Sequence, residues 1–464
     1  MNERLFWAAA LCAVAGFALL LLRRQSPLSV PVLAVGITAV VGVFYPLASL
    51  VIEPRSWRNL SDLSEEALLA TQVDYLAFAI GLTLAVLLAG ALRPRSLATP
   101  SPAPMPSRRI AFRDAFTTWA LLLVGAALYG EYIRRVGYAT LSSTHDFAEK
   151  YYASRGLGTL LLGLNLMIAA CLWAEAGAVG RSTRLAMRAV GGAILFWAIA
   201  VIAVRTYAAA LVLGYVFVFC ERRCFQLRRV RIGVVVLMLV AYLGLEGYAI
   251  LRSTWTRTGD LGAAISMAAQ VGKDDALGSV IGGSELSHPF LTAVEIQQFE
   301  EPGALRGESY VEAVQVFVPL FLWPDRPTTL AQRYVAEYYP ALDARGGGSA
   351  FSFVAEAWWN FGHVLGPLFA GALLGALLML LHERARRSPH GLVQRLVPYL
   401  VFLVLLFHRS QLSASFKLAM SVVLPAVALA LLAEALWVGL VAPKKQQRRS
   451  RPTPAEPHLA TEAR

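Results

Sequence analysis

Charged residues are scarce in this chain. Asp, Glu, Lys and Arg make up 16% of its 464 residues, whereas 57% are hydrophobic. Soluble globular proteins carry about 25% charged and about 45–50% apolar residues. A soluble chain of this length would lack the polar surface needed to cover its core, so the composition predicts an integral membrane protein with several spans.

Cysteine and histidine are also scarce, with four and seven residues respectively. The cysteines lie in apolar runs or at their ends: Cys12, Cys171, Cys220 and Cys224. Because no long polar loop contains a cysteine, a disulfide framework is excluded. The histidines have no metal-ligand spacing. The sequence therefore predicts no metal site and no cofactor.

Apolar runs long enough to cross the hydrocarbon core of a bilayer need about 20 residues. Eleven runs qualify, three of them short: 5–22, 28–51, 73–92, 115–132, 157–179, 189–204, 206–220, 232–251, 362–381, 396–408 and 418–441. The predicted fold class is therefore all-α, a polytopic membrane protein with about 11 transmembrane helices.

Arg and Lys are unevenly distributed among the connections between these runs. Alternate connections hold 25 of the 42 Lys and Arg residues: 23–24, 93–113, 181–188, 222–231, 384–395 and the tail from Lys444. The other connections are longer and more acidic. The positive-inside rule places the basic set in the cytoplasm, the N-terminus outside and the C-terminus inside. The net charge of +12 then reflects topology, and no nucleic-acid partner is predicted.

This topology divides the chain into four parts. Residues 1–251 form a membrane domain with spans 1–8, and 252–355 form one large extracytoplasmic (periplasmic) loop with short helices between spans 8 and 9. Residues 356–442 form spans 9–11, and 443–464 form a basic, disordered cytoplasmic tail. Loops this long are usually functional, so the large loop is predicted to contain functional residues.

Two strings in and after this loop form a distinctive pattern, GESYVEAVQVFVPLFLWPDRP from Gly307 and GGGSAFSFVAEAWWNFGHVLG from Gly346. They resemble the bacterial O-antigen polymerase family, also called oligosaccharide repeat unit polymerases. In that family a G-x-S-Y segment leads to a W-P-[DN]-[KR]-P turn, and a Gly/Ser loop precedes an E-x-[YW]-x-N-F-G segment. The resemblance extends more loosely to Arg205 in AVRTYAAAL and Arg409 in FHRSQLSASF. Trp358 and Trp359 stand where Tyr is commoner.

The resemblance implies a glycosyltransferase at the outer face of the bacterial cytoplasmic (inner) membrane. Its donor is a polyprenyl-pyrophosphate-linked oligosaccharide, and it joins repeat units into a surface polysaccharide such as O-antigen, capsule or exopolysaccharide. The implied partners are this lipid-linked substrate, membrane lipid, and a chain-length regulator and flippase of the same pathway.

Such a reaction needs cations for the developing pyrophosphate charge and a carboxylate for the proton of the acceptor hydroxyl. The predicted catalytic residues are Arg205, Arg326 and Glu356. The predicted substrate-binding residues are Arg252, Asp325, Trp358, Asn360 and Arg409.

These residues also have structural interpretations. Arg205 can snorkel to the interface as an anchor, and Arg326 can pair with Asp325 in a turn stiffened by two prolines. Glu356 can complement a helix dipole, and Trp358 can belong to an interfacial aromatic belt. Arginines at span ends, such as Arg252 and Arg409, are common at membrane interfaces.

Other functions remain open. An O-antigen ligase also has a large outer loop, and other lipid-linked glycosyltransferases often carry an acidic pair in the first outer loop, which Glu65-Glu66 resembles. A transporter or flippase is less favoured, because such proteins often contain inverted repeats and this chain has no internal repeat.

Overall fold

The structure is a computed structural model. It describes residues 2–51, 63–91, 106–142, 153–154, 157–201, 205–223, 225–229, 260, 262–263, 265–267, 287–315, 318, 323, 328–344, 348, 350–388 and 390–449. Every regular element in these ranges is a helix. The prediction of an all-α protein is confirmed.

Seven helices in this part of the chain are long and apolar enough to cross a membrane. They are α1 (Asn2–Leu21), α2 (Val30–Val51), α3 (Glu65–Ala91), α4 (Arg108–Val136), α7 (Gly158–Ala176), α18 (Leu365–Arg387) and α20 (Leu412–Arg449). Each overlaps one of the predicted spans. The composition was therefore a sound guide to a membrane protein.

The predicted count of eleven spans is not confirmed. The predicted run 189–204 is divided between α8 (Arg181–Phe196) and a π-helical turn (Trp197–Val201). The next runs, 206–220 and 396–408, correspond to α9 (Arg205–Arg222) and α19 (Leu392–Phe407). None of these is among the seven membrane-length apolar helices. The remaining run, 232–251, lies outside the described residues.

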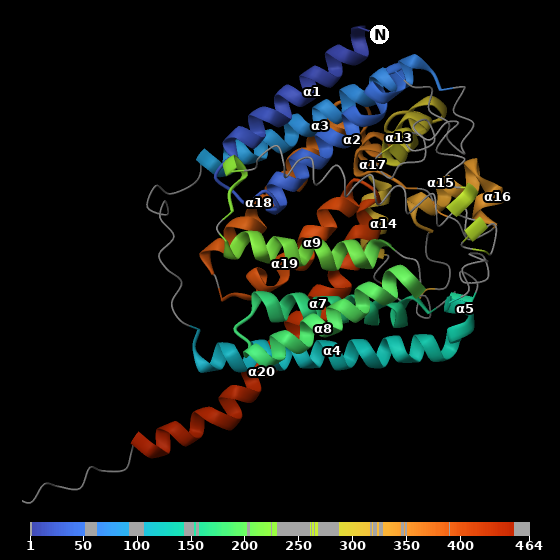
Figure 1. The fold of residues 1–464 in the computed structure, drawn as a ribbon. Coiled ribbons are helices and arrows are strands. Elements are labelled where there is room, and N and C mark those ends of the chain that lie inside the picture. Colours follow the sequence, from blue (N-terminus) through green and yellow to red (C-terminus); the bar gives the residue numbers. More distant parts are fainter. Residues whose placement is uncertain are drawn as a thin grey trace, which may run out of the picture.

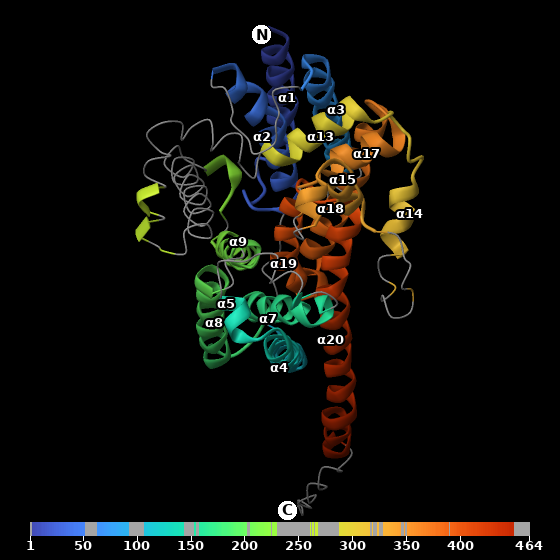
Figure 2. The same cartoon turned by 90° about the vertical axis from the view of Figure 1, so that its right-hand side faces the viewer.

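The long helices form two groups. In both views α1, α2 and α3 lie above α4, α7 and α8, and α9 and α19 lie between them (Figures 1 and 2). Helix α18 packs against α3, and α20 packs against α4 and α7. Each group has its own apolar core, one centred on residues such as Phe78 and Leu82, the other on residues such as Leu121 and Trp173.

Glycines allow the helix backbones to touch in both groups. A Cβ on Gly125 of α4 would lie 2.6 Å from the carbonyl oxygen of Gly163 on α7, and a Cβ on Gly163 would lie 2.5 Å from that of Gly125. Gly81 of α3 and Gly371 of α18 also approach the opposite backbone closely. Small residues at helix interfaces are the usual means of close packing inside membranes.

The described part of 252–355 and the residues that follow it form short helices at one end of the bundle, on the right in Figure 1. These are α13 (Ser287–Phe299), α14 (Glu308–Gln315), α15 (Leu330–Tyr338), α16 (Pro340–Asp343) and α17 (Phe353–Phe361). Helices α13, α15, α16 and α17 share a small core that includes Ile296, Tyr334 and Trp358. Glu295 of α13 accepts hydrogen bonds from Tyr334 and Tyr339, which fixes α13 to α15.

Helix α20 continues beyond the predicted last span into the predicted tail and ends at Arg449. Lys, Gln and Arg are good helix formers, so the sequence can extend the helix past residue 442. Residues 450–464 lie outside the described part.

Candidate functional site

Helix α17 is the centre of the candidate site. Its N-cap Ser352 accepts a hydrogen bond from the backbone N–H of Ala355 over 3.0 Å. Such a cap satisfies one of the free N–H groups of the first turn. The helix ends at Gly362, whose φ of 80° suits glycine. Residues 353–360 are all buried, so both faces of α17 are in contact with neighbouring elements.

Glu356 joins three segments that are distant in sequence. Its side chain is buried, and Oε1 accepts a hydrogen bond from the hydroxyl of Ser309 on α14 over 2.8 Å. Its Oε2 accepts the backbone N–H of Leu412, the first residue of α20, over 2.6 Å. Burial raises the pKa of Glu356 to about 7, although these two hydrogen bonds act to lower it. Glu356 therefore titrates near neutral pH.

Asn360 lies one turn further along α17. Its Nδ2 donates to Ser309 Oγ over 2.8 Å and to the backbone carbonyl of Glu356 over 2.7 Å. Its Oδ1 is buried and has no hydrogen-bond partner among the described residues, and the same holds for the hydroxyl of Tyr310. Buried polar atoms are normally paired, so these two atoms near Glu356 have unused hydrogen-bonding capacity.

The Tyr310 ring holds α14 against α17. It stacks on Phe361 with ring centroids 5.5 Å apart and meets the edge of Phe353 at 6.1 Å. Burial raises the pKa of Tyr310, and the nearby Glu356 raises it further. Tyr310 is therefore a neutral hydrogen-bonding group at physiological pH.

A second polar cluster lies beyond the C-terminal end of α17. The Nδ1 of His363 is 3.0 Å from Trp358 Nε1 and 3.3 Å from Oδ2 of the buried Asp74 on α3. Oδ2 of Asp74 also accepts from Gln297, and its Oδ1 accepts the N–H of Val364, which has a φ of 57°. The hydrogen bond to Asp74 raises the pKa of His363, and partial burial opposes this change.

The loop between α19 and α20 completes the Glu356 surroundings. The backbone carbonyl of Arg409 accepts the N–H of Phe351, and Gln411 Oε1 accepts the N–H of Ala331 at the start of α15. The Arg409 side chain is exposed. This cation therefore lies in a loop whose next residues contact Glu356.

The structure places four of the eight predicted site residues fully. It brings Glu356 and Asn360 together and puts Arg409 in the adjoining loop. Trp358 is completely buried and bonded to His363, so its ring does not lie on a surface where a sugar could stack. Arg205 is the first residue of α9, and its side chain lies outside the described part. The other three residues also lie outside it: Arg252, Asp325 and Arg326.

Four residues of the two polar clusters were not assigned from the sequence: Asp74, Ser309, Tyr310 and His363. Ser309 and Tyr310 stood in the G-x-S-Y string, which was a usable signal. Asp74 was a carboxylate in an apolar run, and such residues are expensive within membranes and often functional. His363 has no signal in the sequence, because its partners come from other helices.

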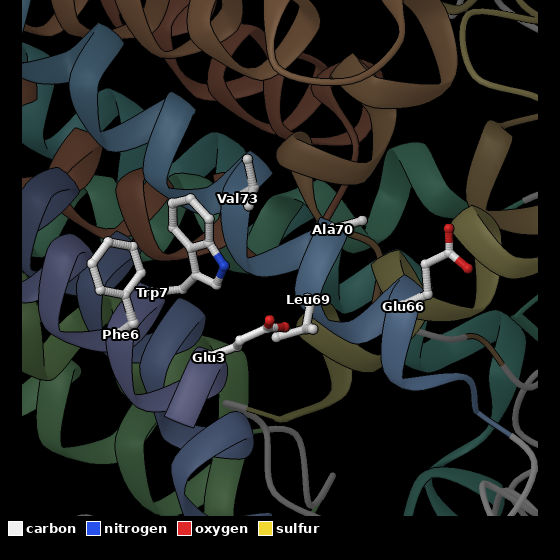
Figure 3. A pocket seen from close by; sticks show the side chains of 7 residues that line it. All are labelled: Glu3, Phe6, Trp7, Glu66, Leu69, Ala70 and Val73. Atoms are coloured by element: carbon white, nitrogen blue, oxygen red, sulfur yellow. The ribbon is translucent and has the colours of Figure 1, made fainter. Parts of the chain in front are cut away.

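A separate hollow of about 790 Å³ lies between the N-terminal parts of α1 and α3 (Figure 3). It is lined by Phe6 and Trp7, whose rings meet edge to face, and by the carboxylates of Glu3 and Glu66. Glu65 forms an ion pair with Arg4. The acidic pair Glu65-Glu66 lies in the first turn of α3, where carboxylates complement the helix dipole.

Among the described residues, no group of three His, Cys, Asp or Glu side chains is arranged to hold a metal ion. The chain matches no protein-family model, no curated protein and no solved structure.

Proposed function

We propose that this protein is a membrane glycosyltransferase that polymerises polyprenyl-pyrophosphate-linked oligosaccharide repeat units into a surface polysaccharide. The reaction takes place at the outer face of a bacterial cytoplasmic membrane. The residues that carry the family resemblance are the basis of this proposal.

The convergence of these residues on Glu356 is the main support. Ser309 comes from the GESY string, Glu356 and Asn360 from AEAWWNFG, and Leu412 from the segment FHRSQLSASF. In the fold all three segments meet through hydrogen bonds of 2.6–2.8 Å. Burying an ionisable group at this point costs free energy.

In the proposed reaction the hydroxyl oxygen of an acceptor sugar attacks the anomeric carbon of the donor glycan. The bond between that carbon and the pyrophosphate oxygen breaks, and polyprenyl pyrophosphate leaves. The acceptor proton passes to the carboxylate of Glu356. A pKa of about 7 suits this role, because a general base works best when its pKa lies near the operating pH.

Sugar hydroxyls are the ligands that match the rest of this cluster. Asn360 Oδ1 and the Tyr310 hydroxyl are buried and have no partner among the described residues, so each can bond a hydroxyl group of the acceptor. The acceptor hydroxyl donates to the carboxylate of Glu356 beside the hydroxyl of Ser309. In this proposal Ser309 and Asn360 position Glu356 and the acceptor.

Cations are required where the pyrophosphate leaves. Arg409 is exposed in the loop beside this cluster, and it is the first candidate among the described residues. Arg205, Arg252 and Arg326 complete the proposed set, with Asp325 as a partner of Arg326. A planar guanidinium binds two phosphate oxygens at once, which suits arginine to this task.

Analysis of lipid-linked glycans in a gene deletion tests the proposed function. A polymerase defect leaves single repeat units on the polyprenyl carrier, and the wild-type gene restores long chains. Accumulation of long polymer on the carrier would identify a ligase instead. An unchanged glycan pattern would exclude both activities.

A further inference from the structure

A cavity of about 520 Å³ lies where α7 ends and α8 and α19 begin. These helix ends are on the left in Figure 1, whereas α13–α17 are on the right. Its polar lining consists of Arg184 of α8, Gln394 and Arg395 of α19, and His390 of the preceding loop. The backbone from Ala176 to Val179, which connects α7 to α8, forms the rest of its wall together with Pro106. Charge sorting predicts that this end faces the cytoplasm.

Among the described residues, two arginines and no carboxylate line this cavity. Six arginines near this end of the bundle form ion pairs with three carboxylates. In one cluster Asp114 and Glu434 pair with Arg109, Arg113 and Arg395. In the other cluster Glu175 pairs with Arg184, Arg188 and Arg222. Three of these arginines, Arg109, Arg188 and Arg222, are exposed to solvent. Arg113 and Arg395 are buried and Arg184 is half-buried, and a charge removed from water in this way is favourable only when it is paired.

Arg184 is the least satisfied of these cations. Glu175 already accepts hydrogen bonds from Arg188 at 2.6 Å and from Arg222 at 3.2 Å. Arg184 Nε remains 4.0 Å from Glu175, and this buried atom has no hydrogen-bond partner among the described residues. Burial and the neighbouring Arg222 lower the pKa of Arg184, and Glu175 opposes this change.

Arg395 differs from Arg184 because its position is fixed. Its Nε donates to Asp114 over 3.0 Å and its Nη1 donates to the carbonyl oxygen of Ala176 over 2.5 Å. Its side chain is buried at 4% exposure. Arg184 Nη2 donates to the carbonyl oxygen of Gly177 over 3.4 Å, so Nε is the buried atom of this side chain that lacks a hydrogen-bond partner among the described residues. A buried arginine held by Asp114 and a half-buried arginine with an unpaired Nε therefore line one cavity.

We infer that this cavity binds a phosphate group, with Arg184 and Arg395 as its cationic contacts. Arginine pairs with phosphate through charge-assisted, often bidentate hydrogen bonds. The cavity lies where the membrane-length helix α7 ends, and Leu185, next to Arg184, exposes 66% of its surface. This position suits the headgroup of an anionic phospholipid whose acyl chains cover Leu185, and phosphate in solution has the same chemistry.

The test measures ligand binding to the purified full-length protein, delipidated in detergent, by thermal shift and native mass spectrometry. The probes are phosphatidylglycerol, zwitterionic phosphatidylcholine and inorganic phosphate. The variants are Arg184→Gln, Arg184→Lys and the matched control Arg181→Gln, which removes a charge from the same helix at an exposed position outside the cavity lining.

We expect phosphatidylglycerol or phosphate to stabilise the wild type and Arg181→Gln, and Arg184→Gln to bind at least about tenfold more weakly, since a charge-assisted contact is lost. Arg184→Lys keeps the charge but not the planar fork, so it should bind with intermediate affinity. If inorganic phosphate binds and phosphatidylglycerol does not, the ligand is phosphate from solution. If only phosphatidylglycerol binds, the ligand is the lipid headgroup. Equal binding by wild type and Arg184→Gln, or no response to either phosphate or phosphatidylglycerol, would overturn the inference.

Discussion

Leu412 donates its backbone N–H to Glu356 Oε2 over 2.6 Å and thereby joins the start of α20 to the first turn of α17. The first N–H groups of a helix have no partner within that helix, so the carboxylate satisfies one of them. The same side chain is the proposed proton acceptor. Its structural and chemical roles predict different outcomes for the same substitution.

The first prediction concerns Glu356→Gln. This substitution keeps the shape of the side chain but removes the base, and loss of a general base typically costs about 10²–10⁴-fold in rate. We expect polymerisation of lipid-linked repeat units by purified protein to fall at least about a hundredfold, with substrate binding retained. Near-wild-type turnover would leave Glu356 with the helix-capping role alone.

The pH profile of the wild type gives a second readout of the same group. The carboxylate is the active form, so kcat/KM should rise with pH and level off above about 7, the pKa of Glu356. Glu301→Gln, which changes an exposed carboxylate in the same region, should leave this profile unchanged. Full activity at pH 5.5 would contradict the assignment.

Ser309→Ala tests whether Ser309 positions Glu356. The Ser309 hydroxyl hydrogen-bonds the carboxylate and so lowers the pKa of Glu356. Its removal should raise that pKa and move the acidic limb of the activity profile to higher pH. Ser415→Ala removes a buried hydroxyl in α20 that bonds Ser410 instead. If the acidic limb of the pH profile were the same in both variants as in the wild type, Ser309 would have no influence on the pKa of Glu356.

Gly125→Ala tests the contact between α4 and α7. The added methyl group would lie 2.6 Å from the Gly163 carbonyl oxygen and 2.9 Å from Met167 Cγ. Overpacking of this kind costs about 1–3 kcal/mol, so we expect a lower melting temperature in detergent. Gly130→Ala in the same helix meets nothing within 4 Å and should be neutral or slightly stabilising, since Ala favours the helix. Equal melting of the two variants would refute the close contact.

Single cysteines at Ser101 and Glu308, in a cysteine-free background, test the predicted topology. Residues 93–113 carry the positive charges of the predicted cytoplasmic set, whereas Glu308 lies in the predicted outer loop. An impermeant maleimide should therefore label Glu308→Cys but not Ser101→Cys in intact spheroplasts. The opposite labelling pattern would invert the orientation.

Composition and hydrophobic periodicity were sufficient for the fold class and for seven membrane-length helices. In the middle of the chain the predicted spans are not confirmed. The sequence around Arg205 predicts two short spans, but the described structure there has a π-helical turn before α9. The length of an apolar run indicates whether a segment can cross the hydrocarbon core of a membrane. It contains little information about where the backbone departs from α-helical geometry.

For the candidate site, the string AEAWWNFG identified Glu356 and Asn360, which are neighbours one turn apart. Their contacts with Ser309 and Leu412 could not be predicted, because they depend on how α14 and α20 pack on α17. The same limit applies to Asp74, which reaches His363 from α3. Sequence patterns predict the faces of single helices, whereas the partners of a buried polar group are set by tertiary packing.

The position of His363 Nδ1 between Trp358 and Asp74 has a spectroscopic consequence. A ring nitrogen either accepts a hydrogen bond or donates one. Neutral His363 can accept the Trp358 indole N–H, whereas protonated His363 donates to Asp74 instead. Because Asp74 raises the pKa of His363, this exchange of partners occurs above the ordinary value of about 6.5. The fluorescence of Trp358 should therefore report this exchange at the junction of α17 and α18. It is measured as the pH-dependent difference between the fluorescence of the wild type and that of His363→Gln.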